Sequence, residues 1–153
     1  MYPVTFLAFG RARLPGIGAL EEHYRNLLRG YVRLELVELA EGRARDPAKQ
    51  LKDEAERLRP RLQAVRCPVL LDAAGKPRSS EDFAAWLKPR IERGDSLAFA
   101  LGSSHGFDAP LKAEIPDKLS LSPMTFPHDL ARVLFLEQLY RAFSLLQGGR
   151  YHK

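Results

Sequence analysis

Hydrophobic and polar positions along the chain switch repeatedly between the spacing of a strand and that of a helix. Short apolar or alternating runs predict strands at residues 4–9, 32–39, 68–72, 96–101 and 119–121. Between these runs, apolar residues recur every three or four positions and predict helices at residues 19–29, 46–64, 79–93, 109–115 and 128–146. This alternation predicts an α/β fold, with a mostly parallel sheet covered by helices on both faces, formed by residues 1–153 as one domain.

Local signals sharpen several of these boundaries. Ser79 followed by Asp82 resembles a capping box that opens a helix, and Gly94 predicts its end. Pro60 falls inside the helical pattern of residues 46–64, so a kink or an end is expected there. The stretch from Ala73 to Pro77 reads as a turn after the third strand.

The last predicted helix, residues 128–146, carries apolar side chains on nearly every side. A helix of this kind must be buried on several sides at once. In a chain of 153 residues this favours a subunit interface in addition to a core contact. We therefore expect contact with another subunit along this helix.

In parallel sheets, ligands bind in the loops that follow the carboxyl ends of strands. Three loops qualify: Asp72–Pro77, Gly102–Asp108 and Ser122–Pro127. The second matches neither a dinucleotide fingerprint nor a P-loop, so an ordinary turn is the alternative interpretation. The third is stiffened by two prolines and suits recognition of an adenine edge, with a plain helix entry as the alternative. His128, directly after it, could be a base, an RNA contact or a structural cap.

The charge distribution points toward a polyanionic partner. The formal net charge is +5, and residues 1–66 hold 13 Lys and Arg against nine Asp and Glu. A basic surface of this kind raises encounter rates with nucleic acid and supplies the non-specific part of its affinity. The alternative is a solvated, arginine-rich surface without a partner.

Cysteine content and hydropathy bear on the compartment and on metal binding. The single cysteine, Cys67, excludes an internal disulfide and is interpreted as a small core residue rather than a nucleophile. The first ten residues lack the features of a signal peptide, and no apolar run reaches the ~20 residues of a membrane span. No His/Cys cluster has metal-ligand spacing. We therefore expect a cytoplasmic protein without a membrane contact or a metal.

The C-terminal segment, Gly148–Lys153, combines an aromatic ring, an imidazole and two cations. An aromatic ring can stack on a flipped base, and cations can hold phosphate. The alternative is a frayed end without a function.

A longer pattern covers the last third of the chain. It reads Ser-x-x-Thr-x-Pro-His from Ser122 to His128, Glu-Gln-x-Tyr-Arg-Ala from Glu137 to Ala142, and Tyr-His at 151–152. Together with Leu70–Asp72 and Gly75–Pro77, this pattern resembles the RlmH family of SPOUT-class methyltransferases. That resemblance implies a homodimeric α/β-knot fold with a C-terminal trefoil. It further implies S-adenosylmethionine-dependent methylation of N3 of a pseudouridine in 23S ribosomal RNA.

Matching motifs assign roles to particular residues. The resemblance implies that S-adenosylmethionine contacts Leu71, Gly102, Ser103, Ser122, Pro123, Met124, Thr125, Phe126 and Pro127. It implies a role at the substrate end of the pocket for Tyr151 and His152, and an RNA or cofactor contact for Arg141. The family loop usually has glycine where this chain has Ser103, and an acidic residue where it has His105.

The mechanism that follows is alignment of an electrophilic methyl group with N3 and removal of the N3 proton. His152 or His128 is the candidate base, with Tyr151 beside it, and His152 is favoured because a mobile tail can close over the substrate. The phosphate contacts are expected to be Arg11, Arg13, Arg150 and Lys153. Two alternatives remain: a non-catalytic ribosome- or RNA-binding protein on the same fold, and a SPOUT methyltransferase that acts on tRNA.

Overall fold

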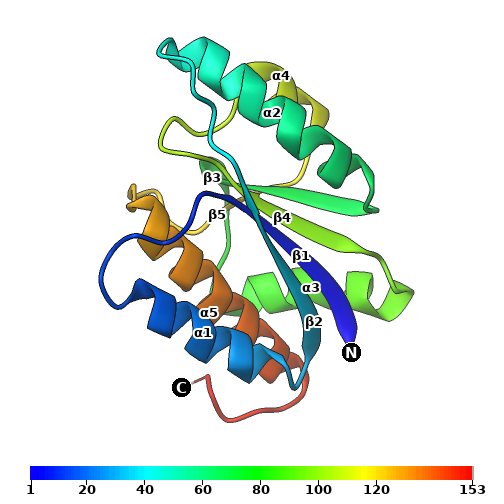
Figure 1. Cartoon of the computed structure of the whole chain (residues 1–153). Coiled ribbons are helices and arrows are strands. Elements are labelled where there is room, and N and C mark those ends of the chain that lie inside the picture. The colour runs from blue at the N-terminus through cyan, green and yellow to red at the C-terminus, as the bar shows by residue number, and fades with distance from the viewer. Residues whose placement is uncertain (153) are drawn as a thin grey trace.

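Strands and helices alternate strictly along the chain in the computed structural model, which describes residues 1–152 (Figure 1). The strands are β1 (Tyr2–Phe9), β2 (Val32–Leu39), β3 (Cys67–Pro77), β4 (Leu97–Leu101) and β5 (Lys118–Ser120). The helices are α1 (Ile17–Leu28), α2 (Pro47–Gln63), α3 (Ser80–Arg93), α4 (Ala109–Glu114) and α5 (His128–Leu146).

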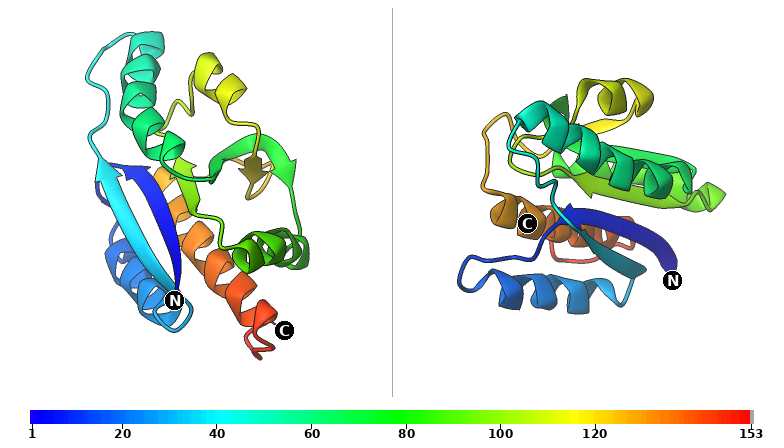
Figure 2. Two further views of the ribbon diagram at one scale, coloured as in Figure 1. Left: turned by 90° about the vertical axis from the view of Figure 1, so that its right-hand side faces the viewer. Right: turned by 45° about the horizontal axis from the view of Figure 1, so that its top comes forward.

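All strands are parallel and form one sheet in the order β2-β1-β4-β3-β5. Helices α1, α3 and α5 cover one face and α2 and α4 cover the other, as Figures 1 and 2 show. The predicted α/β class, with a parallel sheet and helices on both faces, is therefore confirmed. The trefoil knot implied by the resemblance stays a prediction.

Each face of the sheet has its own apolar core. Phe6 and Phe99 point toward the α1, α3 and α5 side, where they pack with Phe135 of α5. On the other side, Leu7 and Leu70 pack against Leu58 of α2 and its neighbours. Side chains of both faces of the central strands are buried, as expected for a sheet covered on both sides.

One local expectation proves wrong, and a second is reduced to one of its two alternatives. The stretch predicted as a turn continues β3, because Lys76 and Pro77 pair with Leu119 and Ser120 of β5 after a register shift. Gly75 permits this shift, since a Cβ there would lie 2.9 Å from backbone atoms of Lys118. Pro60 does not end α2, because the helix runs on to Gln63, and a kink at this position stays a prediction.

Helix α2 continues past Pro60 because its buried side holds it in place and its exposed side can bind water. The side chains of Leu58 and Leu62 are buried in the core and hold the last turns in place. The carbonyl that loses its partner belongs to Glu56, which is exposed and can be satisfied by water.

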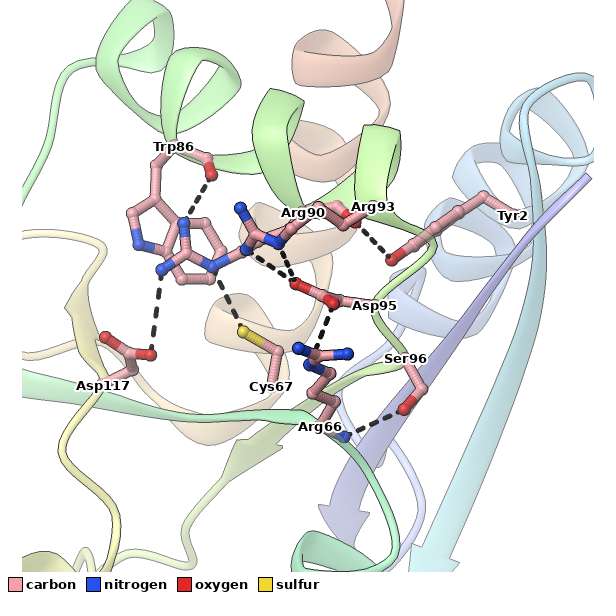
Figure 3. A network of polar contacts seen from close by, with 9 residues as sticks. All are labelled: Tyr2, Arg66, Cys67, Trp86, Arg90, Arg93, Asp95, Ser96 and Asp117. Atoms are coloured by element: carbon pink, nitrogen blue, oxygen red, sulfur yellow. Dashed lines mark hydrogen bonds and ion pairs between the residues drawn. The ribbon is translucent and has the colours of Figure 1, made fainter.

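A polar network closes the amino edge of the sheet (Figure 3). Arg90 lies 3.7 Å from the centroid of the Trp86 ring and donates from Nε to Sγ of Cys67 over 3.1 Å. Asp95 forms ion pairs with Arg66 and Arg93. Cys67 is buried within this arrangement, which fits the predicted role of a core residue.

The described part of the chain, residues 1–152, has no helix that is long and apolar enough to cross a membrane. Within the same residues, no group of three or more His, Cys, Asp or Glu side chains is arranged to hold a metal ion.

Candidate functional site

Three segments that are distant in sequence line one cavity at the carboxyl edge of the sheet, toward the left of Figure 1. They are the middle of β3, the end of β4 and the loop from β5 to α5, and the cavity has a volume of about 120 Å³. Its lining consists of Leu71, Asp72, Ala73, Leu101, Leu121, Ser122, Met124, Thr125, Phe126 and Ala131. We call this the knot-side cavity, after the trefoil that the resemblance predicts for this part of the chain. It contains five of the nine residues that the resemblance assigns to the cofactor.

Most walls of the knot-side cavity are apolar, and its polar groups are fixed locally. Ser122 Oγ accepts from the backbone N–H of Met124 over 3.0 Å, which holds the turn of the β5–α5 loop. Asp72 accepts from the N–H of Ala74 over 3.0 Å and lies 3.5 Å from Nζ of Lys112. An apolar slot with a few fixed polar groups suits a planar, mostly uncharged ring such as a purine.

The loop after β4 is a tight turn beside this cavity rather than part of its lining. A Cβ at Gly102 would lie 2.6 Å from the carbonyl oxygen of Gly106, so only glycine fits. Ser103 and Gly106 form an isolated antiparallel β-bridge across the turn. The Ser103 hydroxyl donates to Glu54 Oε1 over 2.5 Å. Pro123 and Pro127 also lie outside the lining of the knot-side cavity.

A second cavity, of about 310 Å³, lies between α3 and α5 and shares Leu121 and Phe126 with the first. Its polar wall includes Ser80, whose hydroxyl donates to Gln138 over 2.6 Å. Because the two cavities share a wall, a ligand in the first and a group in the second would lie next to each other.

A third cavity, of about 290 Å³, opens on the other side of the β4 turn. Its lining brings together Arg11 and Arg13 from the β1–α1 loop, Ser103 from the β4 turn, and Pro127 and His128 from the start of α5. Predicted RNA-binding residues and predicted cofactor residues therefore line the same hollow.

Two charged residues of α5 fix the loop that carries Arg11 and Arg13. Arg132 is fully buried, pairs with Glu21 at 2.5 Å and Glu38 at 3.1 Å, and donates to the carbonyl of Gly10 over 2.8 Å. Asp129 Oδ2 accepts from the backbone N–H groups of Arg13 and Leu14, over 2.7 and 2.8 Å. Helix α5 thus holds the backbone of the loop that carries Arg11 and Arg13. The same helix directly follows the β5–α5 loop, so it connects the two loops.

Sequence reasoning missed Arg132, Asp129 and Glu54. A signal was present for two of them. Glu54 lies three residues after Leu51 and four before Leu58, on the apolar face of its helix, and Arg132 lies four before the buried Leu136. A charge at such a position has to be paired or hydrogen-bonded inside the protein.

We expect Asp129→Asn to destabilise the protein in a pH-dependent manner. Burial raises the pKa of Asp129, but the hydrogen bonds from Leu14 and Arg13 outweigh it and hold the pKa below its usual range. The stabilisation from this carboxylate is therefore present above about pH 4 and is lost as the pH falls through the lower native pKa. At pH 7 the free energy of unfolding in urea should drop by about 1.5–3 kcal/mol.

At a pH below the lowered native pKa of Asp129, the Asp129→Asn variant should unfold with nearly the same free energy as the unmodified protein. Asp53→Asn on α2 changes the same charge and serves as the control. An equal loss at both pH values would show that the carboxylate charge of Asp129 is not what holds the loop.

His128 lies in the third cavity and is half-buried. Burial lowers the pKa of His128, and the positive charge of Arg132 lowers it further. Its Nε2 is buried without a hydrogen-bond partner among residues 1–152, and its Nδ1 lies 3.6 Å from Asp129. The imidazole is therefore neutral near pH 7, with one ring nitrogen turned away from solvent.

The C-terminal segment folds back along α5. His152 Nε2 lies 2.6 Å from Glu81 of α3, and Nδ1 lies 3.3 Å from Arg141. Tyr151 donates to Glu137 over 3.1 Å, and Arg141 pairs with the same carboxylate at 2.6 Å. Burial, the neighbouring Tyr24 hydroxyl and the negative charge of Glu137 raise the pKa of Tyr151, so this hydroxyl stays protonated.

The structure does not bring every predicted site residue together within one protomer. His128 and Glu137 are nine positions apart on α5, which is about 14 Å along the helix axis. The tail contacts on α5 therefore lie well away from His128 and the third cavity, whereas His152, through Glu81 of α3, lies next to Ser80 in the wall of the second cavity. Arg150 is exposed near the end of the chain, and Lys153 lies outside the described residues.

Comparison with known proteins agrees with this architecture. The family model described as "Predicted SPOUT methyltransferase" matches residues 3–152. A protein named ribosomal RNA large subunit methyltransferase H from Synechococcus sp. is 42% identical over 147 residues, covering 96% of this chain and 94% of its own. Proteins of the same name from Gloeobacter violaceus and Gemmatimonas aurantiaca are 38% and 35% identical, covering 97% and 98% of this chain and 97% and 99% of their own. The chain thus belongs to the family of SPOUT methyltransferases that includes the ribosomal RNA large subunit methyltransferases H.

Proposed function

We propose that this protein methylates N3 of a pseudouridine in 23S ribosomal RNA, with S-adenosylmethionine as the methyl donor. The observation that carries the proposal is the convergence of three carboxyl-end segments on one cavity, directly beside a cavity lined by two arginines. Relatives of nearly full length are named as methyltransferases of large-subunit ribosomal RNA.

The knot-side cavity fits an adenosyl group in its chemistry. Leu71, Leu101 and Phe126 offer apolar walls for a purine, and the β5–α5 loop offers backbone groups that the Ser122 turn holds in place. S-adenosylmethionine supplies a methyl group on a positively charged sulfur and leaves as a neutral thioether. The residues of this chain then have to hold the RNA base and remove its N3 proton.

Among the candidate bases, His152 suits proton removal best. Tyr151 stays protonated and acts as a hydrogen-bond donor. The unpaired nitrogen of His128 is buried, so a substrate cannot reach it without movement of the loop. His152 is partly exposed, and Glu81 on its Nε2 can orient the ring and stabilise its protonated form. Its Nδ1 then accepts the proton, once the 3.3 Å contact with the Arg141 side chain opens to the substrate.

A homodimer is part of the proposal. Leu130 and Leu134 lie one turn apart on α5 and are exposed, as is Leu20 on the adjacent α1. Burial of these side chains against a second copy would remove apolar surface from water. It would also allow the tail of one copy to approach the third cavity of the other, which lies at the start of α5 and away from the tail of the same protomer.

The test is titration with S-adenosylmethionine by calorimetry, followed by transfer of a labelled methyl group to intact ribosomes and to tRNA. We expect saturable binding, labelling of ribosomes only, and a label that mass spectrometry places on a pseudouridine of 23S RNA. Binding of ribosomes without cofactor affinity would identify a non-catalytic RNA-binding protein. Labelling of tRNA alone would assign a different substrate.

Gly102→Ala should weaken cofactor binding through the shape of the β4 turn. The new Cβ would lie 2.6 Å from Gly106 O, so the turn has to open beside the knot-side cavity. We expect at least a tenfold rise in the dissociation constant for S-adenosylmethionine, about 1.4 kcal/mol, in the same calorimetric titration. Gly30→Ala, where the nearest backbone atom is 3.8 Å away, is the control. Equal affinities of the two variants would contradict this role for the turn.

A further inference from the structure

The chain contains the same short motif after each of its first two strands. Residues 10–13 and residues 42–45 both read Gly-Arg-Ala-Arg, and a proline follows two positions later in each case. We propose that these two loops together bind the phosphate backbone of the RNA substrate. Arg43 and Arg45 thereby join Arg11 and Arg13 in one contact surface, which we call the twin-arginine edge. The inference rests on the proposed function and specifies how that substrate is held.

The twin-arginine edge follows from the pairing of β1 with β2. The two strands run parallel in register up to Phe9 and Leu39, and the N–H of Gly10 donates to the carbonyl of Leu39 over 2.9 Å. Both loops therefore start side by side at the carboxyl edge. From there they lead to α1 on one face of the sheet and to α2 on the other, as Figures 1 and 2 show. The four arginines thus lie on two loops that start at neighbouring strand ends and diverge toward opposite faces of the sheet.

All four guanidinium groups are free to meet a ligand. Arg11, Arg13, Arg43 and Arg45 are exposed, and none of them forms an ion pair within residues 1–152. At the amino edge, by contrast, Arg66 and Arg93 are both paired with Asp95. Two carboxylates, Glu41 and Asp46, flank the second loop. They offset only part of the charge of the four arginines, so the twin-arginine edge keeps an excess of positive charge.

Buried groups hold the backbone of each loop. Asp129 and Arg132 of α5 fix the first loop, as described above. In the second loop, the N–H of Gly42 donates to Glu54 Oε2 over 3.0 Å, and Arg57 donates to the carbonyl of Ala40 over 2.7 Å. A Cβ at Gly42 would lie 2.7 Å from Gln50 O, so the loop is pressed against the start of α2.

The same carboxylate connects the second loop to the candidate cofactor site. Glu54 is 2% exposed and accepts through its other oxygen from Ser103 of the β4 turn. The backbone at Gly42, directly before Arg43, is thereby connected to Ser103 through one carboxylate. An extended strand of phosphates is the ligand that matches exposed, unpaired arginines spaced along one edge, because each phosphate can take one guanidinium.

The test compares two double variants with equal loss of charge. Arg43→Ala/Arg45→Ala removes half of the twin-arginine edge, and Arg29→Ala/Arg33→Ala removes two exposed arginines at the opposite, amino end of β2. Affinity for purified ribosomes is measured between 50 and 200 mM NaCl, roughly the range over which counterion release is read. Thermal unfolding and S-adenosylmethionine titration verify that each variant is folded and has an intact cofactor site.

Log affinity decreases linearly with log salt, and the steepness of this decrease should be smaller by about 1.5 to 2 in the Arg43/Arg45 variant, since two phosphate contacts are lost. It should stay at the unmodified value in the Arg29/Arg33 variant. Equal slopes for all three proteins, or equal decreases in both variants, would overturn the twin-arginine edge. Neither result would alter methyl transfer by the unmodified protein, so a failure here is distinguishable from a failure of the proposed function.

Discussion

Replacement of Arg132 by alanine is expected to destabilise the protein by about 3–5 kcal/mol, the cost of removing one member of a buried ion pair. The guanidinium is fully buried between Glu21 and Glu38 and also satisfies the carbonyl of Gly10. Without it, two carboxylates face each other with no cation between them. Against a typical stability of about 5–15 kcal/mol for a single domain, this is a large fraction.

Urea unfolding at 25 °C and pH 7, followed by circular dichroism, measures the loss. The double variant Arg132→Met/Glu21→Gln removes the charges of Arg132 and of the buried Glu21 and should recover much of the stability lost in Arg132→Ala, because the remaining carboxylate, Glu38, is exposed to solvent. It also keeps the test informative if Arg132→Ala does not fold. A loss below about 1 kcal/mol, the range of surface ion pairs, would show that Arg132 does not hold the β1–α1 loop as its contacts indicate.

Replacement of His152 by alanine is expected to lower the single-turnover rate of methyl transfer by about 10²–10⁴-fold, the usual contribution of a general base. His152 lies 2.6 Å from Glu81 and 3.3 Å from Arg141, so its loss removes one imidazole while the Glu137–Arg141 pair remains. The free energy of unfolding should change little, because the ring is partly exposed near the end of the chain.

Rapid-quench measurement of label transfer to ribosomes, with enzyme in excess, isolates the chemical step. His23→Ala, which removes an exposed imidazole from α1, is the matched control. Added imidazole should restore part of the rate of His152→Ala. An unchanged rate in His152→Ala would remove His152 from the base role and would leave the fold and the cofactor cavity unaffected.

The sequence predicted those elements best whose apolar pattern is strong and whose ends carry clear signals. The bounds of β2 and α5 agree to the residue. The hydroxyl of Ser79 accepts from the N–H of Asp82, as the capping pattern indicates, and Gly94 ends α3 in the left-handed conformation. These outcomes depend on contacts between residues close together in the chain, which a sequence displays directly.

Other features depend on contacts that the sequence does not display. The extension of β3 to Pro77 requires β5 as a partner, more than forty positions away. The strand order, and with it the proximity of the β1–α1 loop to the start of α5, follows from tertiary packing. The fold-back of Tyr151 and His152 onto Glu137 and Glu81 is likewise invisible in local patterns.

For the candidate site, the sequence predicted the β3 segment at Asp72 and the β5–α5 loop, which both line the cavity, but the predicted loop Gly102–Asp108 lies beside it and only Leu101 lines it. The groups that hold these segments were not predicted. Glu54 and Arg132 are charged residues at positions on the apolar faces of their helices. A search for apolar periodicity does not identify such residues. Ser103 stands where the family pattern usually has glycine, and its hydroxyl bonds to Glu54. The side chain that departs from the family pattern is therefore the one that connects the β4 turn to α2.

The junction between the two halves of the sheet has a consequence for how the chain reaches this structure. Strands β1 and β4 meet along only a short register, from Val4 with Leu97 to Leu7 with Ala100, and these partners are about ninety positions apart. Closing so long a loop costs entropy before the central pair stabilises anything, and parallel pairing of distant strands is intrinsically slow. Refolding should therefore be limited by the association of β1–β2 with β3–β4, and both would expose unpaired strand edges until they meet.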